Sequence, residues 1–361
     1  QKEFEHYVVN YFCQEYQQGR TPNPCIACNQ HIKFGFLLDK ALSLGADCLA
    51  TGHYARVEHL DGRYHLLKAA DLSKDQSYFL YTLSQERLRH ILFPLGGYTK
   101  AEIHQIAKQE GLSITARPSQ DICFISPKNY RAFLSQRGLS VPGDTVDAQG
   151  KKLGHHKGIA FYTIGQRHGL GSALGKPFYV IKIESENNSI VLGEEKELYS
   201  RKVTATKLSW VTNDLPIEPI TVAAKMRYKS KEAEATLFPT RHGKQGKAIS
   251  DVCFTQPQKA ITPGQAIVFY KGNEVLGGGI ISNGKIKMQN AKIQSKFKNE
   301  NETLMAQSHN EAIKIGCHSE GAKRPKNLLT QVPQDSSPSA QNDKISEAFY
   351  FHTKTSFYFE M

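Results

Sequence analysis

The pattern of apolar residues changes near Pro142-Gly143, and this change most restricts the folds open to the chain. Before it, apolar residues recur at helical spacing between short apolar runs, which is typical of an α/β domain with a parallel sheet. From there to about Asn283, glycines separate short segments with alternating apolar side chains, which indicates turn-rich β structure. The sequence therefore predicts an α/β domain followed by one or two small β-barrels.

One helix-to-strand step is visible in the first domain. Apolar residues within 36–44 recur at helical spacing and stop at Gly45, which suits the end of a helix. Residues 48–51 form a short apolar run that predicts a buried strand, and Gly52 and His53 follow it. Because parallel sheets bind ligands at the carboxyl ends of their strands, Gly52 and His53 are candidate site residues.

The same patterns predict further elements and the domain limits. Helices are expected over residues 77–92, 100–110 and 129–136, and strands over 112–115, 178–183, 189–192, 221–225 and 266–270. We expect domains over residues 1–138, 139–205 and 206–284, with the second limit near 203–210. Residues 285–361 are rich in Lys, Asn and Gln and then in Pro and Ser, so a disordered tail is expected there.

The chain is basic and rich in cysteine. It carries 46 Lys and Arg against 34 Asp and Glu, a formal net charge of +12, which favours a polyanionic partner such as nucleic acid. A basic protein without such a partner fits the charge equally well. No apolar run approaches the roughly 18 residues of a membrane span, and no signal peptide is visible. The seven cysteines therefore indicate reduced thiols and a cytoplasmic protein that contacts no membrane.

The most distinctive segment holds Cys25 and Cys28, three residues apart. Pro22 and Pro24 exclude a helix interior or a central strand, so the cysteines are expected on a rigid turn that leads into a helix. Thiols in that position have lowered pKa values and react as nucleophiles. Three interpretations are open: half of a zinc site with His31, a thioredoxin-like redox pair, and a catalytic thiol with a distant partner. We favour the third, because structural zinc needs four ligands and a redox pair normally follows a strand.

Other segments carry weaker signals. Cys123 lies between Ile122 and Phe124, a setting in which cysteine is often a core residue. Residues 74–76 (Lys-Asp-Gln) fit either a helix N-terminus or contacts to phosphate and base. Residues 227–228 (Arg-Tyr) suit stacking on an RNA base beside a phosphate contact. The sequence contains neither a GxxxxGK[ST] P-loop nor a GxGxxG motif.

Taken together, these motifs resemble those of the tRNA-specific 2-thiouridylases, which thiolate the wobble uridine of tRNA. The matching stretches keep their order between about residues 10 and 282 and include GRTPNPCIACN, LATGHYARV, KDQSYFLYTLS, PSQDICFI, YTIGQRHGLG, AKMRYKS and TPGQAIVFYKGNEVLGGGII. The combination of TPNPCxxCN, KDQSYFLY and SQDICF is highly specific. The resemblance implies an α/β plus β fold: a partial PP-loop domain with a parallel sheet, then two small β-barrel domains.

The resemblance also implies a reaction. ATP, with Mg²⁺, would adenylate O2 of the uridine, and sulfur would then replace the activated oxygen; no tightly bound metal is expected. Cys28 would be the nucleophile and Cys123 would receive sulfur as a persulfide, after which the two would form a disulfide that a reductant resolves. The chemistry agrees, because C2 of uridine is a poor electrophile until its oxygen becomes a leaving group.

Binding residues follow from the same motifs. Asn23, Pro24 and Cys25 would lie against the target base, although family members carry either Cys or Asp at the position of Cys25. Gly52 would contact ATP and His53 would contact tRNA. The further tRNA contacts that the resemblance implies are Lys74, Asp75, Gln76, Arg227, Tyr228 and Gln265.

One family motif is missing. Members begin with a Ser-Gly-Gly-Val-Asp-Ser loop that cradles the ATP phosphates, and no SGGxDS run occurs in this sequence. The expectation is an N-terminally truncated thiouridylase that does not adenylate alone; the alternative is a non-catalytic tRNA-binding fragment. The implied partners are tRNAs for Lys, Glu and Gln and a sulfur donor, either a cysteine desulfurase or a sulfur-relay protein, and the chain is expected to be a monomer.

Overall fold

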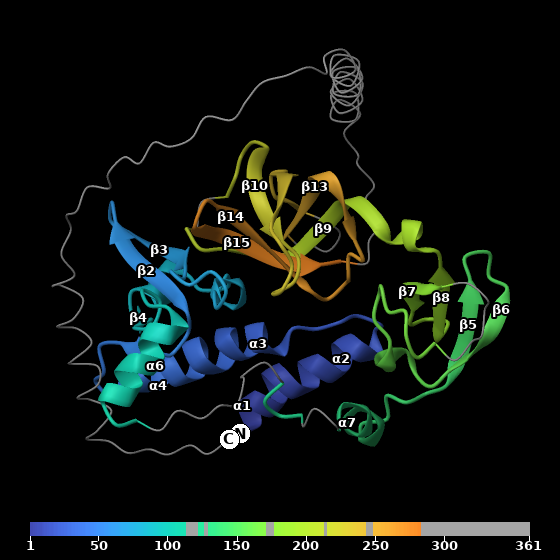
Figure 1. The fold of residues 1–361 in the computed structure, drawn as a ribbon, viewed down its shortest axis with the longest axis horizontal. Coiled ribbons are helices and arrows are strands. Elements are labelled where there is room, and N and C mark those ends of the chain that lie inside the picture. Colours follow the sequence, from blue (N-terminus) through green and yellow to red (C-terminus); the bar gives the residue numbers. More distant parts are fainter. Residues whose placement is uncertain (113–121, 126–128, 171–176, 213–214, 243–247, 283–361) are drawn as a thin grey trace, which may run out of the picture. The chain divides into compact units, whose positions relative to one another are not determined.

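The computed structural model describes residues 1–112, 122–125, 129–170, 177–212, 215–242 and 248–282 (Figure 1). The predicted tail, most of the predicted strand 112–115, and Gln120 and Asp121 of the SQDICF motif lie outside these ranges. Contacts divide the chain into two units, and the described residues all belong to the first, Gln1–Gly284. Within these residues, no helix combines the length and the apolar character needed to cross a membrane.

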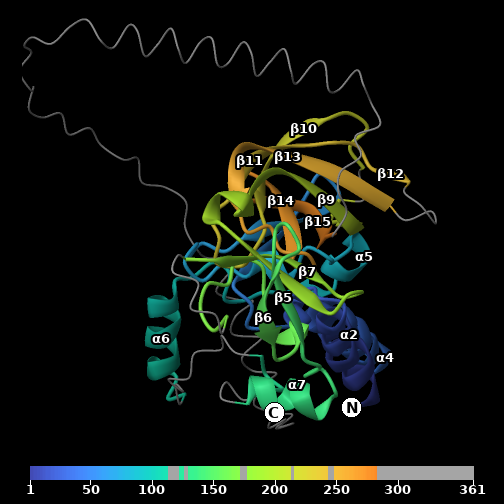
Figure 2. The same ribbon diagram turned by 90° about the vertical axis from the view of Figure 1, so that its right-hand side faces the viewer.

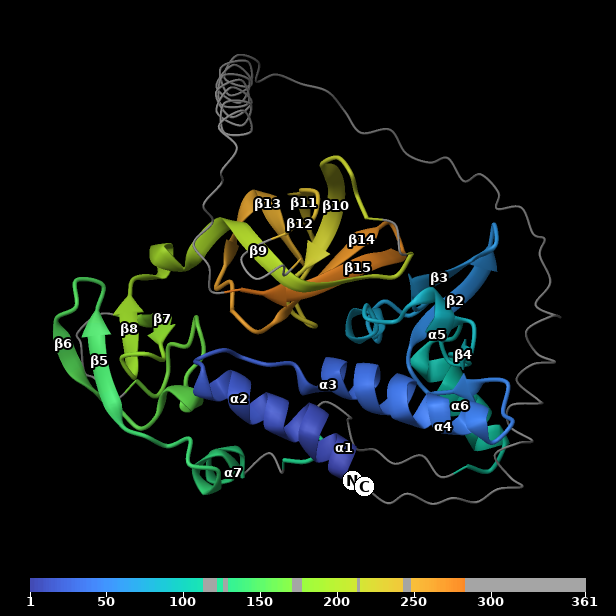
Figure 3. The same ribbon diagram turned by 180° about the vertical axis from the view of Figure 1, so that it is seen from behind.

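Two long helices open the chain (Figure 3). The first runs through α1 (Lys2–Phe4), η1 (Glu5–Asn10) and α2 (Tyr11–Gln17), and the second through α3 (Pro24–Ala27), η2 (Cys28–Leu37) and α4 (Leu38–Ser43). The joints keep right-handed helical backbone angles, so each helix is continuous. Gly45 follows the second helix with a φ of +85°, which suits a glycine after a helix end. The helix predicted over residues 36–44 is confirmed as the last part of this second helix.

A parallel pair of short strands follows. β1 (Leu49–Ala50) pairs in parallel with β4 (Ile91–Leu92), which confirms a strand within residues 48–51. The predicted burial is wrong, because Leu49 is only half-buried and Ala50 is exposed. Between them lies the antiparallel hairpin of β2 (Ala55–Leu60) and β3 (Arg63–Lys68), closed by Asp61 and Gly62 at positive φ. The sequence did not predict this hairpin, although an Asp-Gly pair between alternating residues is a strong hairpin signal.

The helix predicted over residues 77–92 is wrong. The structure has only the 3₁₀ turn η3 (Ser77–Phe79), the single turn α5 (Gln85–Leu88) and β4 in this segment. Consecutive side chains are buried, among them Tyr78, Leu80, Tyr81 and Leu83, so the segment has no polar face for a helix to turn toward water. The other two helices are confirmed as α6 (Lys100–Gln109) and α7 (Tyr130–Gln136).

A small sheet forms the middle of the chain. Its strand order is β6-β5-β8-β7, from β5 (Gly143–Asp147), β6 (Lys152–His156), β7 (Tyr179–Glu184) and β8 (Ser189–Gly193), with 3₁₀ turns η4 (Ile159–Phe161) and η5 (Glu195–Leu198) beside it. Val180, Ile190 and Leu192 are fully buried between the sheet and the loops that cover it. The strands predicted at residues 178–183 and 189–192 are confirmed.

Six strands close into a barrel in the last part of the described chain (Figures 1 and 2). Neighbours pair in the cycle β9-β13-β11-β10-β14-β15 and back to β9, with the short β12 at one edge. The strands are β9 (Tyr199–Trp210), β10 (Ile220–Lys225), β11 (Ala233–Leu237), β12 (Arg241–His242), β13 (Ala248–Lys259), β14 (Ala266–Lys271) and β15 (Glu274–Ile281). They confirm the strands predicted at 221–225 and 266–270, and β9 runs without interruption through residues 203–210, while the domain limits themselves stay predictions.

The hairpin β2–β3 is attached to this barrel. Leu67 of β3 pairs with Glu274 of β15, so the hairpin of the first domain extends the sheet of the barrel. His65 Nδ1 lies 2.7 Å from a carboxylate oxygen of Glu274, and Lys68 at the end of β3 forms an ion pair with Glu232 at 2.8 Å. These contacts join the segment that carries residues 74–76 to the barrel that carries residues 227–228.

Candidate functional site

The loop before the second helix sets the position of the two neighbouring cysteines. Asn23 has extended backbone angles and Pro24 occupies the first helical turn, where a proline lacks only an amide that has no helical partner. Cys25 and Cys28 follow within the first turns of this helix; Cys25 is exposed and Cys28 is half-buried. The prediction of a turn that leads into a helix is confirmed, but its placement of the cysteines on the turn is wrong, because the helix already begins at Pro24 and includes both.

The third cysteine of the expected site lies in a short turn. Ile125 donates its backbone N–H to the carbonyl of Ile122 at 3.0 Å, and Cys123 is exposed on this turn. The neighbouring Phe124 packs edge-on against Phe12 of the first helix, with ring centroids 5.4 Å apart. The aromatic contact thus anchors the turn and leaves the Cys123 thiol accessible.

The three thiols influence one another electrostatically. Burial raises the pKa of Cys28 to about 11; the Lys33 ammonium opposes this rise, and Cys123 and Cys25 add to it. Although Cys25 is exposed at the surface, partial desolvation by the surrounding protein and the nearby Cys123 raise its pKa as well. The expectation of a lowered pKa at this helix start is therefore wrong, because burial outweighs the helix terminus and Lys33. Cys28 is a protonated thiol at neutral pH.

The residues proposed for a zinc site are spread apart. His31 stacks on Tyr7, with ring centroids 4.6 Å apart and planes inclined by 16°. In the part of the chain that the structure describes, no group of three His, Cys, Asp or Glu side chains could hold a metal ion.

Gly52 and His53 lie just beyond β1, at the carboxyl end of the strand. Gly52 is exposed. His53 is buried between Phe34 and Phe93, whose ring centroids lie 5.7 and 5.8 Å away, and its Nδ1 lies 2.8 Å from the Thr51 hydroxyl. Burial, assisted by Lys33, lowers the pKa of His53 to about 3, so its imidazole is neutral at physiological pH.

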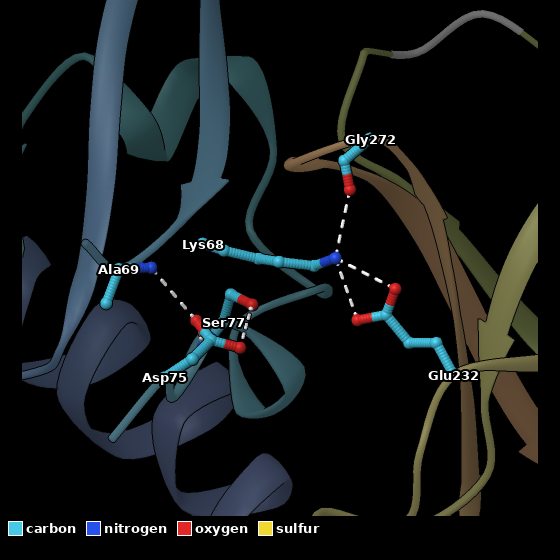
Figure 4. Close-up of polar contacts among 6 residues, drawn as sticks. All are labelled: Lys68, Ala69, Asp75, Ser77, Glu232 and Gly272. Carbon is cyan, nitrogen blue, oxygen red and sulfur yellow. Dashed lines mark hydrogen bonds and ion pairs between the residues drawn. The ribbon is translucent and has the colours of Figure 1, made fainter. Parts of the chain in front are cut away.

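Asp75 and Gln76 bond to their own chain. Figure 4 shows the Asp75 carboxylate turned toward Ala69 and Ser77: it accepts the Ala69 N–H at 3.1 Å and the Ser77 hydroxyl at 2.9 Å. The Gln76 side-chain oxygen accepts the N–H of Tyr54 at 2.9 Å. Asp75 is buried, and Lys74 is half-buried. The first domain therefore uses Asp75 and Gln76 to shape the loop that presents Lys74.

Lys68 lies beside this loop and braces it against the barrel. Its ammonium donates to Glu232 at 2.8 Å and to the carbonyl of Gly272 at 2.9 Å (Figure 4). It also lies 4.6 Å from the ring centroid of Tyr270.

One cavity joins the two weak motifs of the sequence. Its volume is about 390 Å³. It is lined by Leu72, Ser73, Asp75, Lys225, Tyr228, Lys229 and Ser230. The ring of Tyr228 packs against Phe79 at 4.5 Å between centroids. Two lysines and an aromatic ring around one cavity suit contacts to a nucleic-acid phosphate and base. Sequence reasoning missed Lys225 and Lys229, although they flank Met226-Arg227-Tyr228 directly.

Arg227 and Gln265 both make contacts within the protein. The Arg227 guanidinium donates to the hydroxyl of Thr262 at 2.6 Å and to the carbonyl of Ala260. The Gln265 side-chain amide donates to the carbonyl of Thr21 at 3.0 Å. The structure thus places Gln265 against the loop that precedes Cys25, and Arg227 against the turn that carries Gln265.

The fold and the site define a class: an α/β domain of the nucleotide-binding HUP type followed by two β domains. Three family models match in this order, described as the tRNA methyl transferase HUP domain over residues 1–127, the tRNA methyl transferase PRC-barrel domain over 131–194 and the aminomethyltransferase beta-barrel domain over 200–281. They confirm the predicted succession of an α/β domain and two β-barrel domains.

Curated relatives narrow the class to one family. The chain is 50% identical over 283 residues to the tRNA-specific 2-thiouridylase MnmA of Acetivibrio thermocellus, covering 77% of each chain. It is 49% identical to the MnmA proteins of Halothermothrix orenii, covering 78% of each chain, and of Carboxydothermus hydrogenoformans, covering 77% of this chain and 76% of the relative. The chain therefore belongs to the tRNA-specific 2-thiouridylase family.

Proposed function

We propose that this chain acts in the ATP-dependent 2-thiolation of the wobble uridine of tRNA, as a tRNA-uridine 2-sulfurtransferase. Membership of the 2-thiouridylase family supports the reaction class. The observation that carries the residue assignment is the electrostatic effect of Cys123 on Cys28, two residues that are far apart in sequence. Cys28 lies in the first turns of the second helix and Cys123 occupies an exposed turn, which suits two thiols that exchange sulfur.

The proposed transfer balances as follows. ATP, with Mg²⁺, transfers its AMP group to the uridine O2 and releases pyrophosphate, which turns that oxygen into a leaving group. The terminal sulfur of a persulfide on Cys123 bonds to C2, and AMP leaves with the oxygen. The Cys28 thiolate then attacks the Cys123 sulfur, which breaks the persulfide S–S bond and leaves sulfur on C2. The resulting Cys28–Cys123 disulfide is reduced by an external thiol, which returns both cysteines.

The environment of Cys28 suits the second half of this sequence. Its raised pKa keeps it protonated at neutral pH, so it does not attack the persulfide before C2 has been engaged. Lys33 is the cation that favours its thiolate. Gly52, at the carboxyl end of β1, is proposed to contact ATP.

The tRNA is proposed to bind across the first domain and the barrel. Tyr228 lines one cavity together with Lys225 and Lys229. Lys74 and Arg227 are each the sequence neighbour of a residue that lines it. Asn23, Pro24 and Cys25 are proposed to lie against the target base. His53, Asp75, Gln76 and Gln265, for which the resemblance implies tRNA contacts, are engaged within the protein and are proposed to support the tRNA site from there. The substrates are proposed to be tRNAs for Lys, Glu and Gln. A cysteine desulfurase or a sulfur-relay protein is proposed to supply the sulfur, and the protein itself is proposed to be a cytoplasmic monomer.

A thiolation assay tests this proposal. The full chain is incubated with unmodified tRNA, Mg-ATP and a persulfide donor, a cysteine desulfurase with free cysteine, and 2-thiouridine is measured by nucleoside mass spectrometry. The sulfurtransferase proposal predicts product that needs ATP and is lost in Cys28→Ser and Cys123→Ser, whereas Cys48→Ser, at an exposed cysteine before β1, retains it. No product from a chain that still binds tRNA would instead agree with the missing SGGxDS loop. Product that persists in Cys123→Ser would contradict the persulfide assignment.

The alternative is a non-catalytic tRNA-binding protein, and the basic cavity beside Tyr228 favours it independently of the cysteines. It predicts tRNA binding that weakens with salt and is unaffected by Cys28→Ser or by ATP, with no 2-thiouridine formed. The same samples decide between the two proposals.

A further inference from the structure

The loop that leads into the nucleophile helix is held by a turn of the C-terminal barrel. The Thr21 N–H donates to the carbonyl of Pro263 at 2.8 Å. The side-chain amide of Gln265 donates in return to the carbonyl of Thr21 at 3.0 Å and to that of Pro22 at 3.4 Å. Three hydrogen bonds therefore connect residues 21–22 to residues 263–265.

Gly264 shows how closely the two segments approach. It is buried and has a φ of +89°, and a Cβ at this position would lie 2.9 Å from the Cβ of Arg20 and 2.9 Å from the backbone N and O of Thr21. Backbone atoms cannot yield to such a contact without moving the loop. A glycine is therefore required here for both its conformation and its lack of a side chain.

The other side of the loop is also fixed. Arg20 forms a two-pronged ion pair with the buried Glu15 of α2, with nitrogen–oxygen distances of 2.5 and 2.6 Å, and its N–H donates to the carbonyl of Glu15 at 2.9 Å. A two-pronged Arg–carboxylate pair restricts orientation more strongly than a single contact does. The loop is thus bounded by the first helix on one side and by the barrel turn on the other.

Little freedom remains between this contact and the thiols. Pro22 and Pro24 have fixed φ angles, and Pro24 is already the first residue of the second helix. Asn23 between them lies close enough to Tyr78 and Tyr11 to lower the pKa of each hydroxyl, against the larger effect of burial. A shift of Thr21 and Pro22 is therefore passed on to the start of the helix that carries Cys25 and Cys28.

We propose that Gln265 and Gly264 are positioning residues for Cys28: the barrel turn holds the loop that fixes the nucleophile, before any tRNA has bound. Calling Cys28 the nucleophile rests on the proposed function; the positioning itself does not. Family resemblance implies a tRNA contact for Gln265, whereas its amide in this structure serves the Thr21 and Pro22 carbonyls. Arg227 braces the same turn through Ala260 and Thr262, so the turn that holds the nucleophile loop is itself held from within the barrel.

The test measures Cys28 reactivity in the full chain without tRNA or ATP. Iodoacetamide is added at pH 8.5, and the alkylation rate of each cysteine is followed by peptide mass spectrometry. Gln265→Met removes the donor at similar size, and Gly264→Ala introduces the contact with Thr21. Losing two hydrogen bonds worth about 0.5–1.5 kcal/mol each releases the half-buried Cys28, and we expect its rate to rise about 5-fold or more.

Controls separate positioning from unfolding and from RNA contact. Gln258→Met changes a barrel glutamine whose amide donates to the Gln256 carbonyl, and it should leave the Cys28 rate unchanged. The rate of Cys253, on β13, serves as an internal reference in every variant and should stay constant.

An unchanged Cys28 rate in folded Gln265→Met, together with weaker tRNA binding, would overturn the proposal and make Gln265 a plain tRNA contact. An unchanged rate in Gly264→Ala would overturn it as well. Because neither readout needs thiolation, failure of the proposed function would not affect this result.

Discussion

The family resemblance implies a tRNA contact for both Lys74 and its neighbour Asp75, but the structure gives the two side chains different surroundings. Asp75 accepts hydrogen bonds from the Ala69 N–H, the Ser77 N–H and the Ser77 hydroxyl, at 3.1, 3.2 and 2.9 Å. Lys74 is half-buried on the same loop. We predict that Asp75→Ala acts on stability, whereas Lys74→Gln acts on tRNA affinity.

The size of the stability effect follows from the three donors. Ala69 is 3% exposed and Ser77 is fully buried, so water reaches them poorly once the carboxylate is gone. A buried donor left without a partner costs about 1–3 kcal/mol. Taking the lower value for each, Asp75→Ala should cost about 3 kcal/mol, which lowers the melting temperature of a domain of this size by roughly 6–12 °C. Asp75→Asn keeps one acceptor oxygen and should lose less.

Two measurements on the same proteins check this prediction. Calorimetry gives the melting temperature, and filter binding at several salt concentrations gives the tRNA affinity. Lys74→Gln should melt within about 1 °C of the parent and reduce the salt dependence of tRNA binding by about one phosphate contact. If Asp75→Ala melted with the parent and weakened tRNA binding as Lys74→Gln does, the reasoning would be refuted.

Three further predictions follow. The alkylation rate of Cys28 should rise with pH toward a midpoint near 11, whereas an ordinary thiol levels off near 8.5; a midpoint below 8 would contradict the burial of Cys28. The pKa of His53 is lowered on folding, so the unfolded chain binds the proton first and stability should fall as pH drops from about 6.5 toward 3; His53→Phe should flatten this dependence in denaturant titrations. A Cβ at Gly96 would lie 1.7 Å from the carbonyl oxygen of Ala55, so Gly96→Ala should cost about 3 kcal/mol of unfolding free energy, and an unchanged melting temperature would contradict the packing there.

Local patterns of apolar residues predicted a helix and a strand correctly. The helix over residues 100–110 and the strand over 266–270 follow from spacing alone, and both are present. The helix predicted over residues 77–92 is wrong because Tyr78, Leu80 and Tyr81 are all buried in the core. Where neighbouring side chains are all buried, the spacing of apolar residues does not distinguish a helix from other backbone conformations. Tertiary packing decides the backbone conformation of this segment, and the local sequence does not show that packing.

The sequence predicted the reactive residues of the site, but not the pKa of Cys28 or the contacts that hold its loop in place. Cys28 and Cys123 stand out by motif, and the structure brings their thiols within electrostatic reach of each other. The raised pKa of Cys28 was missed, because a helix start lowers a thiol pKa only when the thiol stays solvated. The contact of Gln265 with Thr21 joins segments that are distant in sequence, and no local pattern marks it.

A single-turnover experiment tests the central claim, that sulfur passes from Cys123 to uridine with Cys28 completing the transfer. The chain is loaded with one persulfide sulfur, freed of reductant and given Mg-ATP and unmodified tRNA, and both 2-thiouridine and disulfide-linked peptides are counted by mass spectrometry. The account predicts one Cys28–Cys123 disulfide for each 2-thiouridine formed. Product formed while both thiols stay free, or a disulfide that joins Cys28 to Cys25 instead, would contradict it.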